Sequence, residues 1–333
     1  MKQAIMLCVG ILLSVGTFAA YHAKSAPFFV FKIAVLPEAT TTPERPPRAH
    51  SRATLIFVGD MFFDRYIRTT SRIHGADHPF TCVDAFLKDA DMVIGNLEGP
   101  ITDEDSVSEG TEIGSEENYK FTFPTSTGAL LKKHNIGIVD LGNNHIGNFG
   151  SEGQRSTQSY LTQAGVDYFG GMKGDEPILE RDISGVPFAF VSYNAFLGTT
   201  SAAVARVIAL EREKGKVVIV FAHWGDEYST STDMLKGDAT LFASSGAKLI
   251  VGAHPHVVLP HEIILGTPVY YSLGNFIFDQ YWNDVVTHGL ALRVDIEDGV
   301  VAHIAEHGTQ SETDGRVCMS ATTTAAVATT SSK

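Results

Sequence analysis

The chain has 333 residues, of which 44% are hydrophobic, so it can form one large or two ordinary domains with a sizeable buried core. Its formal net charge of -13 argues against nucleic acid as a partner, because binding a phosphate backbone requires clustered Lys and Arg. The cysteines Cys8, Cys82 and Cys318 are isolated in the sequence and indicate no paired framework, so a metal site would have to use His, Asn and carboxylates.

The first 26 residues are typical of a membrane-targeting segment. Lys2 precedes an uncharged apolar run from Ala4 to Ala20, and small residues around Ala26 would suit a signal peptidase. The alternative is a buried core helix, which the terminal position disfavours. We therefore expect residues 1–26 to be a signal peptide or signal anchor and the protein to be exported, either secreted or anchored outside the cytoplasmic membrane. Proline and threonine spacing predicts an extended linker over residues 27–52.

The main domain is expected to span residues 53–310, where short apolar runs alternate with helical patterns. Such alternation predicts a layered α/β domain, with parallel strands covered on both faces. Strands are expected at 54–58, 91–98, 136–141, 186–193, 217–222, 249–251, 267–272 and 290–295, and helices at 127–135, 152–164, 202–214 and 234–245. Asp298-Gly299 favours a hairpin turn after the last strand. Residues 311–333, rich in Ser, Thr and Ala, are expected to form a low-complexity tail.

Polar side chains follow five of the expected strands, and they share a chemistry. Each is a carboxylate, an amide or an imidazole, and the set comprises Asp60, Asn96, Glu98, Asn144, His223, His254 and His256. Mixed oxygen and nitrogen ligands suit manganese, iron or zinc better than calcium or magnesium. Two such cations about 3.5–4 Å apart can support attack on a phosphoryl centre. A shared carboxylate is needed between them, and Glu98 is the expected bridge.

Each of these residues also has a simpler explanation when taken alone. Asp60 could form a turn after Gly59, and Asn96 and Glu98 precede a Gly-Pro turn. His223 could be an ordinary core or surface histidine. His254-Pro255-His256 is the most specific pair, because the proline is expected to hold an extended backbone that points both imidazoles the same way. The recurrence at five strand ends favours a common metal site.

The stretch Asn143-Asn144-His145 adds a candidate for proton transfer. The Asn144 side-chain oxygen is a neutral hard ligand, and His145, held off the metal, could pass a proton to a leaving oxygen. The alternative is a polar turn in which Asn143 or Asn144 caps the following helix.

Six motifs in order resemble those of the bacterial CapA family, associated with poly-γ-glutamate capsule biosynthesis, within the calcineurin-like metallophosphatase superfamily. They cover about residues 53 to 310 and lie at Gly59–Arg65, Gly95–Glu98, Asn143–His145, His223–Tyr228, Gly252–His256 and Gly274–Gln280. The resemblance implies an αββα sandwich of two mixed sheets flanked by helices, with a site for two divalent metal ions at the strand ends.

The resemblance also implies roles for single residues. Asp60 and His256 would hold one metal ion, Asn144, His223 and His254 the other, and His145 would donate a proton. Arg65, Trp224 and Glu227 would line the substrate cleft, although a salt-bridge partner, a core aromatic and a surface charge are the respective alternatives. Asn275 and Asp279 belong to a family motif, with no chemistry assigned.

One departure from the superfamily bears on activity. The superfamily begins with Asp-x-His, whereas this chain has Asp60-Met61-Phe62, so the first metal lacks a histidine and could be completed by water or Asn96. The first functional hypothesis is a metal-dependent hydrolase of a phosphoester or of a γ-glutamyl polymer. The second is a non-catalytic accessory subunit that binds poly-γ-glutamate or another anionic cell-surface polymer beside membrane synthase subunits. Hydrolysis of cell-wall amide bonds is a third.

Overall fold

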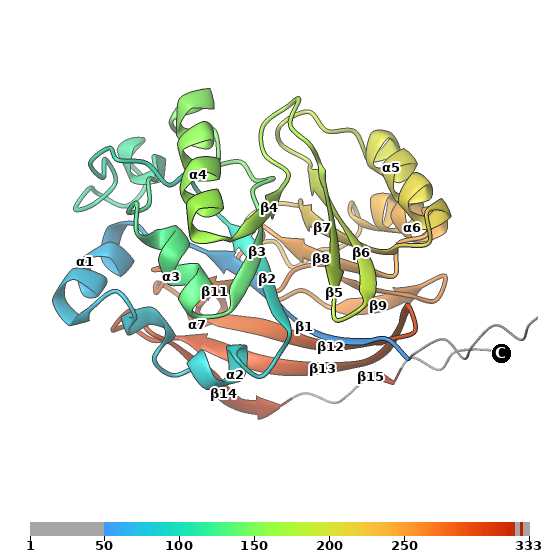
Figure 1. Cartoon of the computed structure of the whole chain (residues 1–333). Coiled ribbons are helices and arrows are strands. Elements are labelled where there is room, and N and C mark those ends of the chain that lie inside the picture. Colours follow the sequence, from blue (N-terminus) through green and yellow to red (C-terminus); the bar gives the residue numbers. More distant parts are fainter. Residues whose placement is uncertain (1–49, 324–326, 329–333) are drawn as a thin grey trace, which may run out of the picture. The chain divides into compact units, whose positions relative to one another are not determined.

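Two β-sheets face one another in the computed structural model, which describes residues 50–323 and 327–328 (Figure 1). Helices cover the outer face of each sheet, so the layers follow the order helix, sheet, sheet, helix. This is the expected αββα sandwich. Both sheets are mixed, because parallel central strands are extended at their edges by antiparallel strands.

The first sheet has the strand order β14-β13-β12-β1-β2-β3-β4, and β11 and β15 pair with β1 and β13. Strands β1 to β4 are parallel and apolar, whereas β12 to β14 form an antiparallel meander. The bounds are β1 Arg52–Met61, β2 Met92–Leu97, β3 Ile136–Asp140, β4 Asp167–Phe169, β11 Asn275–Ile277, β12 His288–Glu297, β13 Val300–Ser311, β14 Val317–Thr323 and β15 Val327–Ala328. The predicted hairpin after Glu297 is confirmed as β12 and β13.

The second sheet has the strand order β5-β6-β7-β8-β10-β9. Its central strands β6, β7 and β8 are parallel, and β5 and β9 are antiparallel edges. The bounds are β5 Ile178–Ile183, β6 Val186–Asn194, β7 Val217–His223, β8 Leu249–Ala253, β9 His261–Ile264 and β10 Thr267–Tyr270.

The helices separate into two groups. The first sheet packs against α1 Arg65–His74, α3 Thr127–Lys133 and α4 Gly150–Ala164, with the short α2 Asp84–Leu87 nearby. The second sheet packs against α5 Ser201–Glu213 and α6 Lys236–Ser245. The remaining helices are short: the 3-10 turns η1 His78–Phe80 and η2 Glu117–Tyr119, and α7 Asp284–Thr287.

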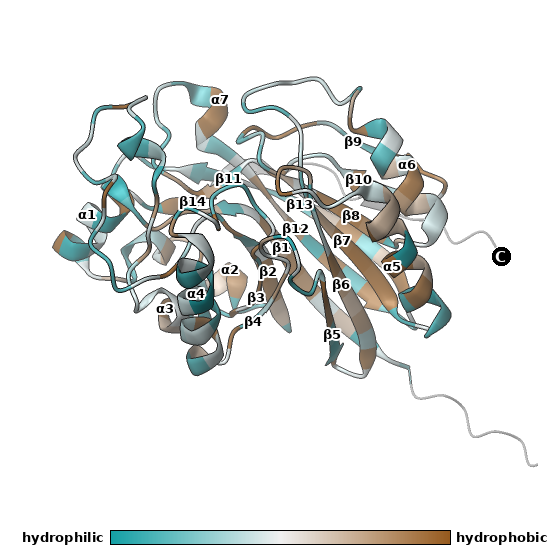
Figure 2. Cartoon of the chain, turned by 90° about the horizontal axis from the view of Figure 1, so that it is seen from above, coloured by the Kyte–Doolittle hydropathy of each residue, from teal (hydrophilic) through white to brown (hydrophobic). Residues whose placement is uncertain are grey.

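Alternation along the strands explains why three separate layers of core form. In β1, Leu55 and Phe57 point into the layer between the sheets, whereas Ile56 and Val58 pack under the helices of the first sheet. Successive strand side chains point to opposite faces, and both faces are covered, so the strand is apolar at every central position. From above, the central strands are mainly hydrophobic, and hydrophilic residues colour the outer helices (Figure 2).

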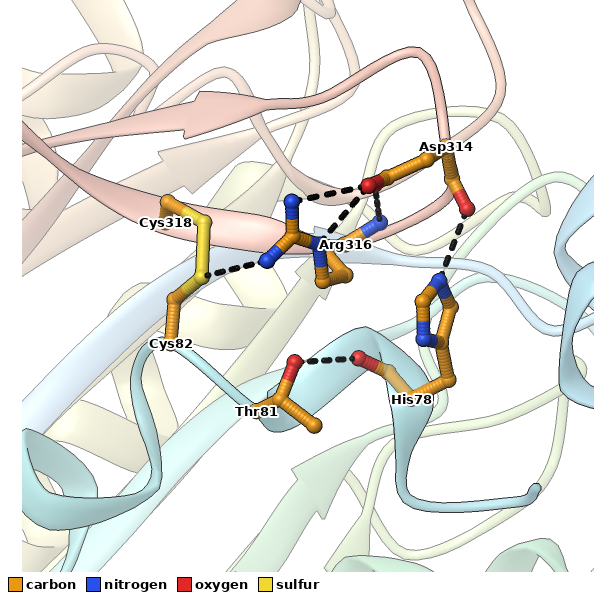
Figure 3. The surroundings of a disulfide bond; sticks show 6 residues. All are labelled: His78, Thr81, Cys82, Asp314, Arg316 and Cys318. Atoms are coloured by element: carbon orange, nitrogen blue, oxygen red, sulfur yellow. Dashed lines mark hydrogen bonds and ion pairs between the residues drawn. A yellow bond between two sulfur atoms is a disulfide. The ribbon is translucent and has the colours of Figure 1, made fainter. Parts of the chain in front are cut away.

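The chain beyond residue 310 is part of the first sheet, which extends the domain past its expected boundary. Strand β13 continues to Ser311, and β14 pairs with it over Val317–Thr323. Cys318 in β14 forms a disulfide with Cys82 (Figure 3). The expectation that these two cysteines are unpaired is therefore wrong, because a separation of 236 residues leaves no local pattern in the sequence.

The predicted signal peptide or anchor, residues 1–26, and most of the predicted linker, residues 27–52, lie outside the described residues. None of the helices within residues 50–323 combines the length and apolar character that crossing a membrane requires.

Candidate metal centre

Strand register brings the polar motifs to one edge of the two sheets. Asp60 pairs with Asn96 where the parallel strands β1 and β2 end, and Asn96 pairs with Asp140 of β3. In the second sheet, His223 at the end of β7 pairs with Ala253, which directly precedes His254. Parallel strands place their carboxyl ends on the same side, and this is where α/β folds bind ligands.

Two groups of buried side chains meet at this edge, and each could hold a metal ion. One comprises Asp60, Glu98 and His256, and the other Glu98, His223 and His254, with ligand atoms within 4.8 Å of one another in each group. Glu98 belongs to both. Its Oε1 lies 3.6 Å from His256 Nε2 and 4.0 Å from His223 Nε2. The two groups thus contain five of the seven residues expected to bind metal.

Three buried atoms of these groups lack a partner that a bound cation would supply. Glu98 Oε1, His223 Nδ1 and His254 Nδ1 have no hydrogen-bond partner among the residues that the structure describes. A buried carboxylate oxygen without a partner is costly unless a cation is bound nearby. The carboxylate and imidazole donors suit manganese, iron or zinc. The residues present therefore fit a divalent metal ion.

The electrostatics of the site point the same way. Burial, together with the nearby charge of Asp60, holds the pKa of Glu98 well above its usual value. Burial alone would raise the pKa of Asp60 too, but hydrogen bonding and charge from His256 outweigh it, and the pKa falls below the usual value. Burial lowers the pKa of His223, and that of His254 to about 4. The histidines are thus held neutral, which is the form that binds metal.

Asn144 reaches the second group, as expected. Its Oδ1 lies 2.9 Å from Nε2 of His223. The neighbouring Asn143 turns inward instead, and its Oδ1 accepts hydrogen bonds from the backbone N–H groups of His145 and Ile146. Asn143 therefore fixes the turn that presents Asn144 and His145. Neither asparagine caps the following helix, because α4 begins at Gly150 and its N-cap is Phe149.

Asn96 is not a metal ligand, which corrects the sequence-based expectation. Asn143 Nδ2 donates to the Leu97 carbonyl and to Asn96 Oδ1, so the Asn96 oxygen is occupied. The Asn96 amide nitrogen then donates to Asp60 Oδ1 at 2.8 Å and to Glu98 Oε2 at 3.2 Å. An amide N–H cannot coordinate a cation. Asn96 orients the two carboxylates and satisfies the oxygens that face away from the other ligands.

The His254-Pro255-His256 segment is not extended, so that expectation is wrong as well. His254 has a φ of 95° and His256 a φ of 58°, both in the left-handed region that non-glycine residues rarely adopt. Such strain is stored where function requires it. The turn sends His254 toward Glu98 and His223, and His256 toward Asp60 and Glu98, so the pair divides between the two groups.

Asn275 orients His256, a role that the sequence did not reveal. Its Oδ1 lies 2.9 Å from His256 Nδ1, and its Nδ2 donates to the Val286 carbonyl and to Gln280 Oε1. The carbonyl partner fixes the amide, so Asn275 accepts from His256 and leaves Nε2 directed at Glu98. Its position in the sixth motif was a signal, but no pattern connected it with His256.

His145 lines the same hollow as His256, at the edge of the centre. Its Nδ1 lies 3.2 Å from Asn148 Oδ1, which also accepts from the backbone N–H of Phe121. Nδ1 therefore carries the proton, and the other ring nitrogen is the acceptor. Burial lowers the pKa of His145 to about 3, so the free side chain is neutral near pH 7.

The three residues expected to line the substrate cleft differ in their positions in the structure. Glu227 is exposed and lines the hollow with His145. Arg65 also lines it, but its guanidinium already binds Asp279 and Asn118 within the protein. Trp224 is only 1% exposed and donates to the Tyr271 carbonyl in the core beneath the second sheet. The substrate role of Trp224 is therefore wrong, and the core alternative is correct.

The missing histidine of the first motif leaves an aromatic in its place. Phe62 is fully buried and stacks on Phe278, with ring centroids 4.6 Å apart. The first group therefore has only three members among the described residues, Asp60, Glu98 and His256.

The sequence of this chain is similar to those of capsule synthesis proteins. The family model described as bacterial capsule synthesis protein PGA_cap matches residues 54–280. The capsule biosynthesis protein CapA of Bacillus anthracis is 28% identical over 263 residues, covering 71% of this chain and 62% of that protein. The PGA biosynthesis protein CapA of Bacillus subtilis (strain 168) is 29% identical over 246 residues, covering 68% and 63%. The chain thus spans about three fifths of the length of these relatives.

Among solved structures, a single mutant of Vps29 from Entamoeba histolytica is similar to this chain. It aligns with a TM-score of 0.26 and 11% identity, covering 58% of this chain and 82% of that chain.

Proposed function

This chain belongs to the CapA family of bacterial capsule synthesis proteins, and from that premise we propose that it is an exported metal-dependent hydrolase of phosphoesters. The observation that carries the proposal is Glu98, a buried carboxylate shared by two groups of potential metal ligands. A shared carboxylate is the arrangement that a pair of closely spaced cations requires. We propose manganese, iron or zinc as the ions.

Two divalent ions bound there would supply Lewis-acid polarisation of a phosphoryl oxygen and lower the pKa of water. The residues of the chain itself would orient the metal ligands. Asn96 and Asn275 hold Asp60, Glu98 and His256 in place before the substrate arrives. This preorganisation reduces the cost of rearrangement during reaction.

His145 is the proposed proton donor to the leaving oxygen. In the free protein it is neutral, with its acceptor nitrogen available, because burial depresses its pKa. A bound phosphoryl anion near this nitrogen would raise that pKa by direct charge interaction, so His145 would gain its proton with the substrate. Asn148 keeps the ring oriented through Nδ1.

Export is part of the proposal and has two kinds of support. The apolar segment after Lys2 is typical of a leader. The Cys82–Cys318 disulfide is independent support, because such bonds persist in oxidising compartments outside the cytoplasm.

Hydrolysis of bis(p-nitrophenyl) phosphate by the manganese-loaded protein tests the proposal. His223→Ala and His254→Ala should each lower kcat/KM by at least about a hundredfold, since losing a ligand exceeds the 10–100-fold cost of losing an outer-shell partner. His74→Ala, an exposed histidine on α1, is the matched control and should retain full activity. Equal activity in all four proteins would defeat the catalytic proposal.

A second candidate function is favoured by Phe62. Because it occupies the position of the superfamily histidine, the first metal group is short of a ligand. The protein would then be a non-catalytic subunit that binds poly-γ-glutamate or another anionic polymer beside membrane synthase subunits. Polymer binding that survives chelation, without turnover, would favour this candidate.

A further inference from the structure

A groove extends from the metal centre across the surface of the domain. Its near part, a hollow of about 210 Å³, is lined by His145, His256 and Tyr228. Its far part, about 340 Å³, is lined by residues of α1 and of the segment 108–118. The two parts share four lining residues and so form one continuous groove: Arg65, Ile113, Asn118 and Trp282. A substrate held at the metal centre can therefore extend well beyond the reacting group.

Exposed aromatic rings line the groove from end to end. Trp282 is 54% exposed, Tyr119 47%, Tyr66 44% and Tyr228 42%. The rings of Tyr228 and Trp282 meet edge to face, with centroids 5.6 Å apart. Rings of this kind offer a flat apolar face with a polar tip, which suits a ligand that is apolar on one side and wet on the other.

The charges of the groove are compensated or negative. Arg65 is the one Arg or Lys side chain among the described residues that line it, and its donors are committed to Asp279 and to the Asn118 oxygens. Glu109 is paired with Arg72 outside the groove, and Glu227 is exposed beside the metal centre. Beyond the metal centre, a polyanion would therefore meet carboxylates and no available Arg or Lys side chain among the described lining residues, inside a protein whose net charge is -13.

The remaining polar groups are neutral. The hydroxyls of Thr69, Ser108 and Thr111 and the amide of Gln280 already form hydrogen bonds within the protein, and Ser108 and Gln280 are buried. None of the described lining residues lies in a strand, so the groove offers no sheet edge for a peptide backbone. The groove therefore offers a ligand mainly the flat faces and polar tips of its aromatic side chains, and these match sugar rings, which have an apolar C–H face and a rim of hydroxyls.

We propose that the groove binds an uncharged saccharide chain through Trp282 and the tyrosines that line it. Resting on the proposed function, the substrate is then a phosphoester whose sugar portion extends from the metal centre along the groove. The charges of the groove beyond the metal centre disfavour a polyanion such as poly-γ-glutamate.

Binding to the full-length, EDTA-treated protein tests the groove separately from catalysis. The chain has two tryptophans, and Trp224 is buried, so a change in fluorescence on adding ligand reports Trp282. The probes are cellotetraose and the tetramer of N-acetylglucosamine, with oligomeric poly-γ-glutamate as the charged counterpart. At least one saccharide should bind saturably and change the emission, and polyglutamate should not.

Variants identify the surface that binds. By calorimetry, Trp282→Ala and Tyr66→Ala should each weaken saccharide binding about tenfold or more, as expected for aromatic anchors. Leu210→Ala, an exposed apolar residue on α5, is the matched control and should bind like the wild type. Trp282→Phe should keep binding but lose the fluorescence change.

Four results would overturn the inference. The first three are no saturable binding of either saccharide, binding that both aromatic variants leave unchanged, and a polyglutamate signal from Trp282. Binding of a proline-rich peptide alone, lost in Trp282→Ala, would assign the groove to a protein partner and also overturn it. Binding is measured without metal and hydrolysis with manganese, so the two tests are independent. Saccharide binding by a protein that shows no hydrolysis after manganese loading would contradict the proposed function and leave the groove intact.

Discussion

The metal centre and the groove lie next to each other but are built from different parts of the fold. Asp60 and His223 are the last or nearly last residues of parallel strands, and both are fully buried. Trp282 comes from a connecting segment and Tyr119 from the 3-10 turn η2, and both expose about half of their side chains. The centre is thus positioned by the sheets, whereas the groove is shaped by α1 and by segments outside the sheets.

The two regions also differ in how polar groups are satisfied. In the groove, Arg65 and Asp279 compensate each other. In the centre, Glu98 Oε1 and two imidazole nitrogens lack partners among the described residues. The groove, whose charges are paired, can select ligands by shape and stacking. The metal centre, whose buried carboxylate oxygen and imidazole nitrogens have no partners in the described part of the chain, requires a cation. Variants should therefore affect one function and spare the other.

The largest expected effect is on stability and concerns the groove side. The Cys82–Cys318 disulfide anchors β14, which follows the β13–β14 connection. This connection packs tightly against α1, because a Cβ atom at Gly315 would lie only 2.5 Å from Thr70 Oγ1. Helix α1 also carries Tyr66. Around the disulfide, His78 Nε2 donates to the Asp314 carbonyl, and Arg316 approaches Cys82 Sγ (Figure 3).

Replacing both cysteines, Cys82→Ser with Cys318→Ser, should lower the free energy of unfolding by about 3–5 kcal/mol, because a long loop is no longer closed in the unfolded chain. Urea unfolding with and without reductant measures this. Reductant should destabilise the wild type to the same extent and leave the double variant unchanged. Bound metal should stay at the wild-type level at low denaturant. Loss of metal in the folded double variant would show that the two regions are not independent.

The next effect concerns the centre and depends on pH. Asp140 ends β3 and is fully buried, and burial raises its pKa to about 7. The folded protein then binds this proton more tightly than the unfolded chain does. Its stabilising contribution is complete below pH 4 and is lost as the pH rises toward 7 and above.

Asp140→Asn removes this dependence. Relative to the variant, the wild type should lose up to about 4 kcal/mol of unfolding free energy between pH 4 and 8, at about 1.4 kcal/mol per pKa unit. Urea unfolding at several pH values measures the difference. Asp103→Asn, an exposed position, is the control and should parallel the wild type. A constant difference between wild type and Asp140→Asn would contradict the assignment.

The smallest effect compares two asparagines, one in each region. Asn275→Ala removes the acceptor that orients His256 and should weaken metal binding about 10–100-fold. Asn118→Ala removes an oxygen that holds Arg65 and should weaken saccharide binding while sparing the metal. Metal titration and calorimetry on both variants would separate the effects. Equal losses of both ligands in both variants would remove the distinction between the regions.

The sequence predicted the centre better than the groove, and the reason is physical. Parallel strands are apolar throughout, so a carboxylate or histidine after such a run, as at Asp60 and His223, marks a strand end at a common edge. The main strands and helices were predicted for the same reason, because both faces of each sheet are covered. Outside α1, the groove comes from short turns and connecting segments, which carry no periodic pattern.

The errors share a cause, since each depended on contacts between distant parts of the chain. The role of Asn96 is decided by Asn143, which occupies its oxygen. Trp224 points into the core because its indole N–H finds the Tyr271 carbonyl. The disulfide joins β14 to the turn before α2, and these two segments come together only when the domain is folded. Local patterns contain no information on these pairings.

The central claim is that Glu98 joins two groups of ligands into a single dimetal site, and elemental analysis tests it most directly. After equilibration with manganese and removal of unbound ions, the full-length protein should retain about two ions per chain. Glu98→Gln should lose both, whereas Glu227→Gln, the same change at an exposed position in the same cleft, should retain them. A wild-type protein without metal, or a Glu98→Gln variant that retains as much as the wild type, would contradict the account.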